Sequence, residues 1–275
     1  MTKAKNIKIY QIYYDQASKE KLDPNFIALD NSANQRPDWC EYWPIRNVLL
    51  NEHFEADTYI GFFSPKFFAK TSIDAEKVIS IVNASNAEVI SFSPLFAHNA
   101  FFLNSFIQGE AAHPGLLKLT KKLLIHLNID IEIESLVCDQ TTTIFSNYFV
   151  AKYEFWLIWF SFAEKLFQLC ENTGGEFADN LVSNTRHESA DGTPMKVFIM
   201  ERLITLVLEL SNISAQMGVD IDIKNISHSG FKTALDLDKL IICDALKSQF
   251  RKTKMQIYLD AFYRNKEALI LLYRK

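Results

Sequence analysis

Residues 58–92 read TYIGFFSPKFFAKTSIDAEKVISIVNASNAEVISF, and this stretch predicts the fold. Residues 58–63 and 88–92 are short runs rich in aromatic and β-branched residues, which is typical of buried strands, and each run is followed by Ser-Pro. Between them, residues 74–83 repeat apolar side chains at the three- and four-residue spacing of a helix. A strand, a helix and a strand in this order favour an α/β sheet over a sandwich of two sheets.

The flanking sequence extends this pattern in both directions. The alternating or apolar segments that we expect to be further strands are residues 7–14, 129–134 and 219–223. The segments with helical spacing are residues 44–49, 116–127, 155–169 and 195–210, and the last of these is apolar nearly all round, as in a buried helix. Residues 173–193 are polar and predict an exposed loop or lid. We therefore expect an α/β domain over residues 1–236, with a helical C-terminal extension over residues 237–275 packed on it.

Composition narrows the class of function. The 275 residues are 48% hydrophobic and carry a net charge of −4, whereas a protein that binds duplex nucleic acid usually has a basic balance. The sequence shows no secretory signal at its start, and its longest apolar runs are far shorter than the ~20 residues that span a bilayer. The four cysteines are far apart in the sequence, which favours reduced thiols over a disulfide framework. These features predict a cytoplasmic protein that does not bind nucleic acid.

Several well-known catalytic motifs are absent from the sequence. It has no phosphate-binding P-loop, no G-x-G-x-x-G, no G-x-S-x-G and no H-E-x-x-H. Two D-x-D triplets, Asp220-x-Asp222 and Asp236-x-Asp238, could hold a divalent cation. Equally, the first triplet has the spacing of a strand's polar face, and the second has the position of a helix start.

Three polar and aromatic stretches follow or precede the predicted elements, and together they predict a ligand-binding mouth. They are residues 34–46 (NQRPDWCEYWPIR), 61–71 (GFFSPKFFAKT) and 108–115 (QGEAAHPG). The alternative for the first is a surface loop held by its tryptophans. In the second, the phenylalanines fit a core, and in the third, His113 fits a helix start.

Glu201 and Arg202 lie inside the apolar helix predicted over residues 195–210. Burial of a charge is costly unless the charge is paired or used, so both residues are candidates for function. The alternative is a solvated stripe along the helix, since Glu201, Thr205 and Glu209 are spaced by four residues.

Taken together, these segments resemble bacterial glycosyltransferases of capsule and O-antigen gene clusters, which have a GT-A-like (Rossmann-like) fold. The resemblance covers approximately residues 8–212 and rests on the order and spacing of its pieces. The matching pieces are IKIYQIYYD (7–15), FIALDNS (26–32), RPDWCEYWPIRNVL (36–49), YIGFFSPKF (59–67), SNYFVAKYEFWLIW (146–159) and VFIMERL (197–203). It implies transfer of a sugar from a nucleotide-sugar donor to a glycan or lipid-linked acceptor in surface polysaccharide synthesis.

The resemblance also suggests roles for individual residues. Glu201 would be the general base, with Glu110 and His113 as substitutes. The residues expected to contact the nucleotide of the donor are Tyr14, Asp15, Asp30 and Asn31, and Trp39 or Trp43 would stack on a ring. The cations expected to neutralise the diphosphate are Arg36, Arg46, Lys66 and Arg202. Ser64 and Asn147 are also expected at the donor site.

One departure from the family pattern concerns metal binding. The D-x-D that usually follows a mid-chain strand is missing, although a divalent cation such as Mn²⁺ or Mg²⁺ remains compatible with the sequence. Its absence motivates a second hypothesis, a non-catalytic module that binds a sugar nucleotide or a partner. A third hypothesis is a nuclease or phosphohydrolase that uses the late D-x-D triplets. The sequence leaves the oligomeric state open.

The C-terminal tail is rich in basic residues at helical spacing. Such a tail is typical either of a solvated helix face or of peripheral contact with an anionic membrane, here at its inner face.

Overall fold

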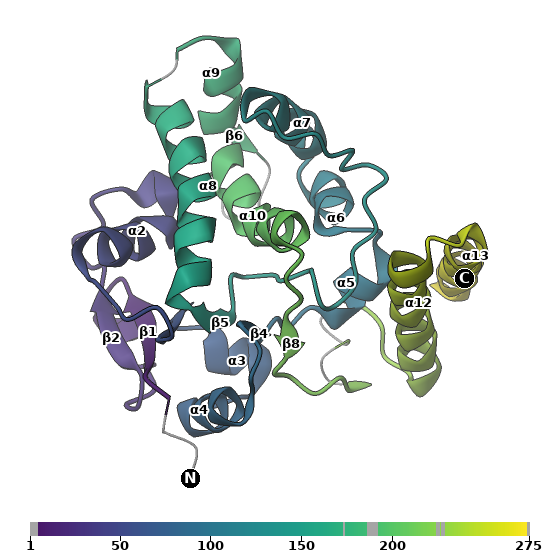
Figure 1. Ribbon diagram of the computed structural model, residues 1–275, viewed down its shortest axis with the longest axis horizontal. Coiled ribbons are helices and arrows are strands. Elements are labelled where there is room, and N and C mark those ends of the chain that lie inside the picture. Colours follow the sequence, from purple (N-terminus) through teal and green to yellow (C-terminus); the bar gives the residue numbers. More distant parts are fainter. Residues whose placement is uncertain (1–4, 173, 186–191, 224–225, 227–228, 274–275) are drawn as a thin grey trace.

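The fold is organised around a six-stranded β-sheet (Figure 1). The structure is a computed structural model that describes residues 5–273, except residues 173, 186–191, 224–225 and 227–228. The strands are β1 (Ile7–Tyr13), β2 (Ile27–Asp30), β3 (Tyr59–Phe63), β4 (Val89–Ser91), β5 (Phe149–Lys152) and β8 (Gln216–Met217). They lie in the order β2-β1-β3-β5-β4-β8, and β5 runs antiparallel to both of its neighbours while the other pairs are parallel. The protein is therefore of the α/β class, as predicted.

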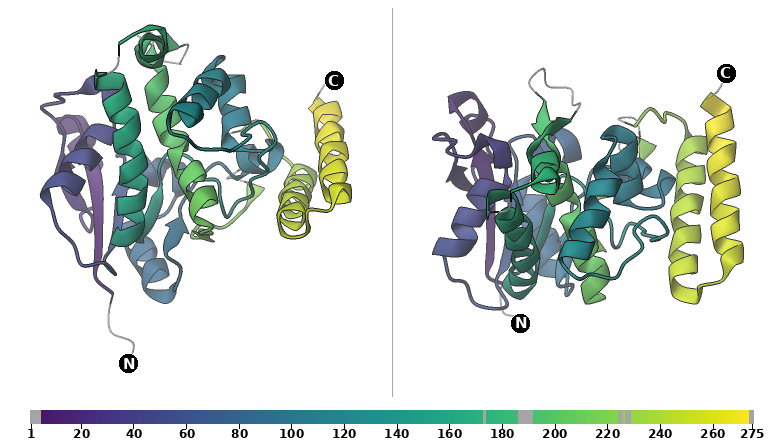
Figure 2. Two further views of the ribbon diagram at one scale, coloured as in Figure 1. Left: turned by 45° about the horizontal axis from the view of Figure 1, so that its top comes forward. Right: turned by 90° about the horizontal axis from the view of Figure 1, so that it is seen from above.

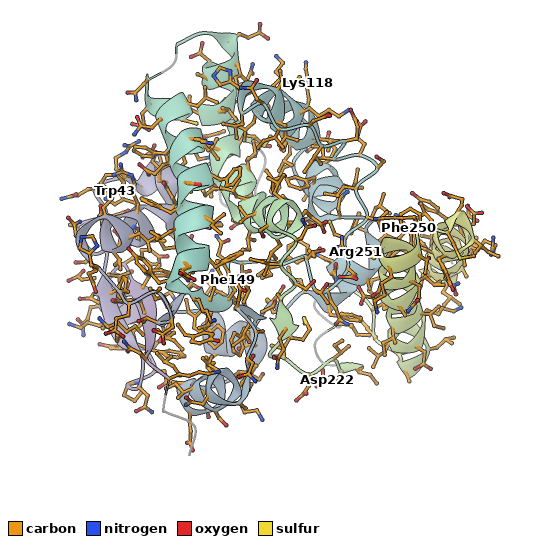
Figure 3. The ribbon with its side chains drawn as sticks, viewed as in Figure 1. Trp43, Lys118, Phe149, Asp222, Phe250 and Arg251 are labelled. Atoms are coloured by element: carbon orange, nitrogen blue, oxygen red, sulfur yellow. The ribbon has the colours of Figure 1, made fainter. Side chains whose placement is uncertain are left out.

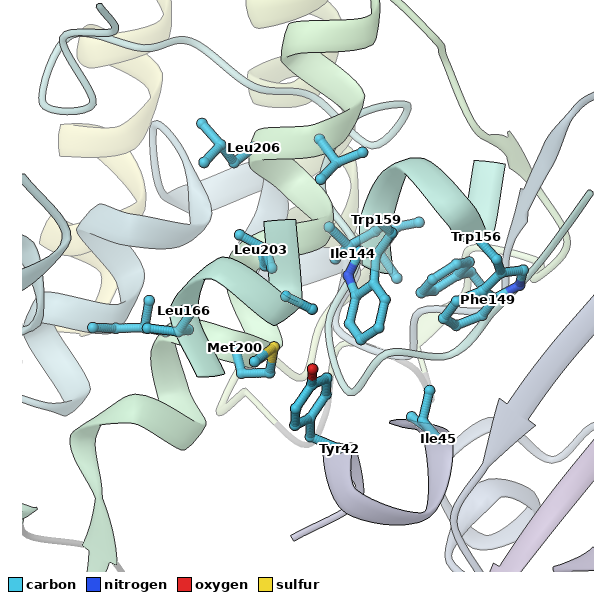
Figure 4. Close-up of a cluster of buried hydrophobic side chains, with 14 of the residues drawn as sticks. Tyr42, Ile45, Ile144, Phe149, Trp156, Trp159, Leu166, Met200, Leu203 and Leu206 are labelled. Carbon is cyan, nitrogen blue, oxygen red and sulfur yellow. The ribbon is translucent and has the colours of Figure 1, made fainter. Parts of the chain in front are cut away.

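Helices cover both faces of the sheet, which explains why β3 is apolar and buried along its whole length. One face packs against α2 (Tyr42–Asn51), α8 (Tyr153–Asn172) and α10 (Met195–Ser211), and the other against α3 (Phe67–Thr71) and α4 (Ala75–Ala84). Figure 4 shows the first of these cores, where side chains of α2, α8 and α10 meet. Within it, Trp156 stacks on Phe149 and its indole N–H donates to the carbonyl oxygen of Ile60 at 2.8 Å, which joins α8 to β5 and β3.

Shorter elements complete the body of the protein. They are α1 (Gln16–Lys19), the 3₁₀ helix η1 (Pro37–Trp39), α5 (Phe96–Phe101), α6 (Ser105–Ala112), α7 (Leu116–His126), α9 (Glu176–Val182) and the two-residue strands β6 (Asn184–Thr185) and β7 (Thr193–Pro194), which pair with each other.

Two long helices, α12 (Ala234–Thr253) and α13 (Gln256–Tyr273), form an antiparallel hairpin at the end of the molecule opposite β1 and β2 (Figures 1 and 2). The helix α12 begins with a capping box, in which the Thr233 side chain accepts from the Asp236 N–H. A third core cluster joins the hairpin to α5 through buried side chains that include Ala97, Leu240 and Phe262. None of the helices among the described residues combines the length and the hydropathy that crossing a bilayer requires.

Two predicted strands are wrong. Residues 129–134 form no strand, because the Asn104 side-chain amide, rather than a neighbouring strand, donates to the carbonyl oxygens of Ile133 and Leu136. Residues 219–223 are also not a strand: β8 ends earlier, and the last contact with β4 is the hydrogen bond from the Gly218 N–H to Ser91.

Other boundaries also differ from expectation. The sequence did not predict β5, whose residues precede the aromatic helix α8 directly. The segment expected to be a loop or lid, residues 173–193, contains α9 and both short paired strands, while residues 173 and 186–191 lie outside the described part of the chain.

Candidate functional site

A pocket of about 420 Å³ lies at the carboxyl ends of the parallel strands β1 and β3. In open α/β sheets this edge is where ligands bind. Tyr14 directly follows β1 and Ser64 directly follows β3, so the chain places both at the pocket. The lining residues are Tyr14, Ser18, Lys21, Asn34, Pro37, Cys40, Glu41, Ser64, Pro65, Lys66 and Lys70.

A hydrogen bond between the hydroxyls of Ser64 and Tyr148, 2.5 Å long, connects the pocket residue Ser64 to the segment that precedes β5. Tyr148 stands just before β5, after two residues with left-handed backbone, Ser146 (φ 62°) and Asn147 (φ 52°). Such conformations are uncommon for residues other than glycine and concentrate at functional sites. In addition, the buried Oδ1 of Asn147 has no hydrogen-bond partner among the described residues.

Two carboxylates approach the pocket from different elements. Glu41 lines it directly and accepts a hydrogen bond from the phenol of Tyr14. Glu201 comes from α10 and does not line the pocket itself, but it interacts electrostatically with Glu41 and Lys70, which do; it makes no hydrogen bond or ion pair with the described residues. Burial raises the pKa of Glu201, and the nearby Glu41 raises it further, against the opposing effects of Arg202 and Lys70. This carboxyl group is therefore poised to take up a proton at a higher pH than an exposed glutamate.

Three lysines, Lys21, Lys66 and Lys70, give the same pocket a positive wall. Two of them, Lys66 and Lys70, also line a neighbouring pocket of about 280 Å³ with the largely apolar walls Ala69, Pro94 and Leu95. The two pockets thus meet at this pair of ammonium groups. Ammonium groups at the junction of two pockets suit a ligand with an anionic centre, such as a phosphate group.

Of the residues that the sequence predicts at the donor, Tyr14, Ser64 and Lys66 lie together in the pocket. Asp15, next to Tyr14, has another task, because its carboxylate caps α1 by accepting from the Ser18 N–H. Asp30 accepts hydrogen bonds from the Tyr13 hydroxyl and the Ser32 N–H, which lower its pKa to about 2.

Asn31 is buried directly after β2. Its N–H donates to the carbonyl oxygen of Tyr13, so this backbone contact continues the pairing of β1 with β2. Like Asp15 and Asp30, it is not among the residues that line the pocket.

The two arginines expected to neutralise a diphosphate are instead used between α2 and α8. Arg46 pairs with Glu164 (2.6 Å), and Arg36 pairs with both Glu171 (2.6 Å) and Asp38. These pairs hold the η1–α2 segment against α8 and leave neither guanidinium in the pocket.

The two tryptophans of the same stretch also lie away from the pocket. Trp39 is buried and donates through its indole N–H to Glu171, and Trp43 lies under both arginines, on the outer side of α2 (Figure 3). Neither is placed to stack on a ligand in the pocket, which their rings do not line.

Arg202 and Glu110 make contacts that hold neighbouring helices. The Arg202 guanidinium is buried and donates to the carbonyl oxygens of Ser105 and Phe198 and to the Gln108 side chain. Glu110 accepts from the N–H groups of Gly115 and Leu117 and so caps α7.

His113, the other substitute base, ends α6 and stacks on Phe198 at 3.6 Å between ring centroids. Since His113 and Glu110 lie outside the pocket, Glu201 is the predicted base that lies nearest to it.

The described residues contain no group of three His, Cys, Asp or Glu side chains that could hold a metal ion. In the late triplets, the Asp236 carboxylate belongs to the capping box of α12, and Asp238 points to solvent on the same helix. This arrangement does not fit a two-carboxylate metal site at residues 236–238.

Sequence reasoning missed Glu41, Lys70, Lys21 and Tyr148. A signal for Glu41 was present in the sequence, because this residue lies in the polar and aromatic stretch of residues 34–46. Lys70 lies four residues after Lys66, which places both lysines on one side of α3.

Comparison of this chain with known protein families, with curated proteins and with solved structures found no match.

Proposed function

We propose that this protein is a GT-A-like glycosyltransferase that moves a sugar from a nucleotide-sugar donor to a hydroxyl group of a glycan or lipid-linked acceptor, in the cytoplasm. The observation that carries the proposal is the position of Glu201. Its carboxylate has no hydrogen-bond or ion-pair partner in the described part of the chain and lies close to Glu41 and Lys70, which line the pocket. The resemblance of residues 8–212 to such enzymes supports the same reaction, because its Glu-Arg-Leu motif contains this residue.

In the proposed reaction, the acceptor oxygen forms a bond to the anomeric carbon while the bond from that carbon to the diphosphate oxygen breaks. Glu201 takes the proton of the acceptor hydroxyl, for which a raised pKa is favourable. The nucleoside diphosphate leaves with the electron pair, and Lys66 and Lys70 stabilise its negative charge. No step is assigned to a metal ion, because the described residues offer no carboxylate cluster for one.

The first experiment measures melting temperatures with UDP, GDP, dTDP and ADP, each with and without Mn²⁺. A ligand that binds only the folded state raises the melting temperature by mass action. We expect a selective rise with one nucleotide class, without a requirement for Mn²⁺. If no nucleotide raises the melting temperature, the proposal is wrong.

The second experiment measures release of free nucleotide from sugars of the class so identified. Glu201→Gln should lower turnover by about 10²–10⁴-fold, the usual contribution of a general base, and leave nucleotide binding nearly intact. Glu267→Gln on the exposed side of α13 is the matched control and should retain turnover. Nucleotide binding without turnover in the unmodified protein would favour the non-catalytic binding module.

A further inference from the structure

The turn between α12 and α13 exposes apolar and basic side chains side by side. Met255 is 55% exposed and Ile257 is 61% exposed, and Lys252 and Lys254 flank them on the exposed surface. Lys254 has a left-handed backbone (φ 57°) and ends α12, so the chain reverses at this point. The turn forms one end of the hairpin, at the edge of the molecule (Figure 2).

The lysines of the turn differ from the other basic residues of the hairpin. Lys247 donates to the carbonyl oxygens of Asn99 and Phe102, and Arg251 pairs with Glu209, so both hold the hairpin to the body. In contrast, Lys252 and Lys254 form no ion pair with any described residue, and the Lys254 ammonium group lies over the Phe250 ring, 5.9 Å from its centroid. Their ammonium groups are therefore available to an external anion.

Charge is also distributed unevenly along the chain. Residues 234–275 contain nine lysine or arginine residues and five aspartate or glutamate residues, whereas the whole chain has a net charge of −4. The hairpin is thus the basic end of an acidic protein. This asymmetry favours contact between this end of the molecule and a negatively charged surface.

We propose that the turn of residues 252–257 docks on an anionic lipid bilayer. Met255 and Ile257 would enter the boundary between headgroups and acyl chains, and Lys252 and Lys254 would contact lipid phosphates, since long basic side chains place their charge at that level. A bilayer fits this turn better than a protein partner does. A stable protein interface buries about 800 Å² on each side, which is far more than the two apolar side chains of the turn supply. The other large exposed apolar side chains of the hairpin lie outside the turn: Leu235, Ile241, Ile242, Tyr263, Leu271 and Leu272.

Because the hairpin is attached to the body, docking of the turn would also hold the rest of the protein at the bilayer. Besides Lys247 and Arg251, the buried carboxylate of Asp244 accepts from the Asn99 side chain and the Gln140 N–H. These contacts join α12 to α5 and to the loop before β5, so the turn has a defined position relative to the sheet.

The test is flotation of the purified full-length protein with vesicles of phosphatidylcholine alone or with 30% phosphatidylglycerol. We expect binding to the anionic vesicles only, and its loss in 0.5 M NaCl. Lys252→Ser with Lys254→Ser should weaken binding about fivefold for each lysine removed. Met255→Ser with Ile257→Ser should weaken it by a comparable factor.

The matched control is Lys118→Ser with Ile125→Ser on α7, where Ile125 is 76% exposed. It removes one basic and one highly exposed apolar side chain elsewhere and should leave vesicle binding unchanged.

Melting temperatures of all variants show whether each one folds. No binding to anionic vesicles, equal loss in the control, or a concentration-dependent dimer that the turn variants abolish would each overturn the proposal. Vesicle binding is measured without any catalytic assay. A failure of the docking proposal can therefore be told apart from a failure of the proposed function.

Discussion

Glu201 places a carboxyl group in a helix, α10, most of whose residues are apolar and buried. The sequence predicted that this residue would be unusual because a charge interrupts an apolar run, and the structure shows where it lies. Its effect on stability has a definite sign. Since burial raises its pKa in the folded state above the ordinary value of 4.5, the folded protein holds this proton more tightly than the unfolded chain does.

Glu201→Gln should therefore stabilise the protein at neutral and alkaline pH. As pH rises from about 4.5 to the native pKa, the unfolded chain loses the proton first, so the wild-type protein loses stability and the amide variant does not. At pH 8 we expect a melting temperature higher by roughly 2–4 °C in the variant, with a smaller difference at pH 4. A difference that does not grow with pH would contradict this prediction.

A comparison of Lys66 with Arg46 tests which of these cations binds the nucleotide. Lys66→Met should weaken nucleotide binding about tenfold or more, because a hydrogen bond to a charged group is lost from the pocket. Arg46→Met should change it less than twofold, because its guanidinium pairs with Glu164 outside the pocket. Titration calorimetry with the nucleotide found in the melting screen measures both. The reverse order would return the arginines to the donor site.

At the scale of elements, the start of the helix α7 shows a structural role for a carboxylate that the sequence predicted as a substitute base. Glu110 precedes His113 in a polar stretch, which favoured a role in catalysis. In the structure it accepts from two N–H groups at the start of α7, at 2.9 and 2.7 Å. Those N–H groups have no partner within the helix, so Glu110 stabilises α7.

Glu110→Ala should lower the free energy of unfolding by about 0.5–2 kcal/mol, as expected for loss of a helix cap. Chemical denaturation monitored by circular dichroism measures this change. Glu110→Gln, which keeps one acceptor oxygen, should lose less. Turnover measured at a temperature where each variant is folded should remain close to that of the wild-type protein. A loss of turnover like that of Glu201→Gln would instead make Glu110 a catalytic residue.

At the scale of the whole molecule, a buried polar cluster joins the C-terminal hairpin to the body. Burial raises the pKa of Asp244 to about 6 and lowers the pKa of Lys247 to about 8. Lys247 lies fully buried in α12 and donates to two carbonyl oxygens of the α5 region, including that of Phe102 at 2.7 Å. Lys247 is thus a fully buried cation among the groups that hold the hairpin to the body.

Lys247→Met should destabilise the protein by roughly 3–5 kcal/mol, because it leaves the buried carbonyl oxygens of Asn99 and Phe102 without their donor and removes a positive charge that stabilises the buried Asp244 carboxylate. We expect faster hydrogen exchange in α12 and α13 than in β1 and β3. Lys252→Met on the exposed side of α12 is the control and should change stability by less than about 0.5 kcal/mol. Equal exchange in the hairpin and in the sheet would show that they open together.

The sequence by itself determined the parts of this protein that follow from local periodicity. Apolar runs of strand length predicted β1, β3 and β4, and helical spacing predicted α4, α8 and α10, because these patterns reflect burial against a single sheet. The same reasoning identified Tyr14, Ser64 and Lys66, since polar residues directly after parallel strands meet at one edge.

Only the tertiary structure decided which charged groups are left for a ligand. Arg36 forms an ion pair with Glu171 and Arg46 with Glu164, and each partner lies more than 100 residues further along the chain. No local sequence pattern predicts such partners. The alternating residues 129–134 likewise pair with no strand, and the Asn104 side chain donates to the carbonyl oxygen of Ile133. The physical reason is the same in both cases: local sequence specifies what a side chain can bind, while the partner that it meets depends on contacts between distant segments.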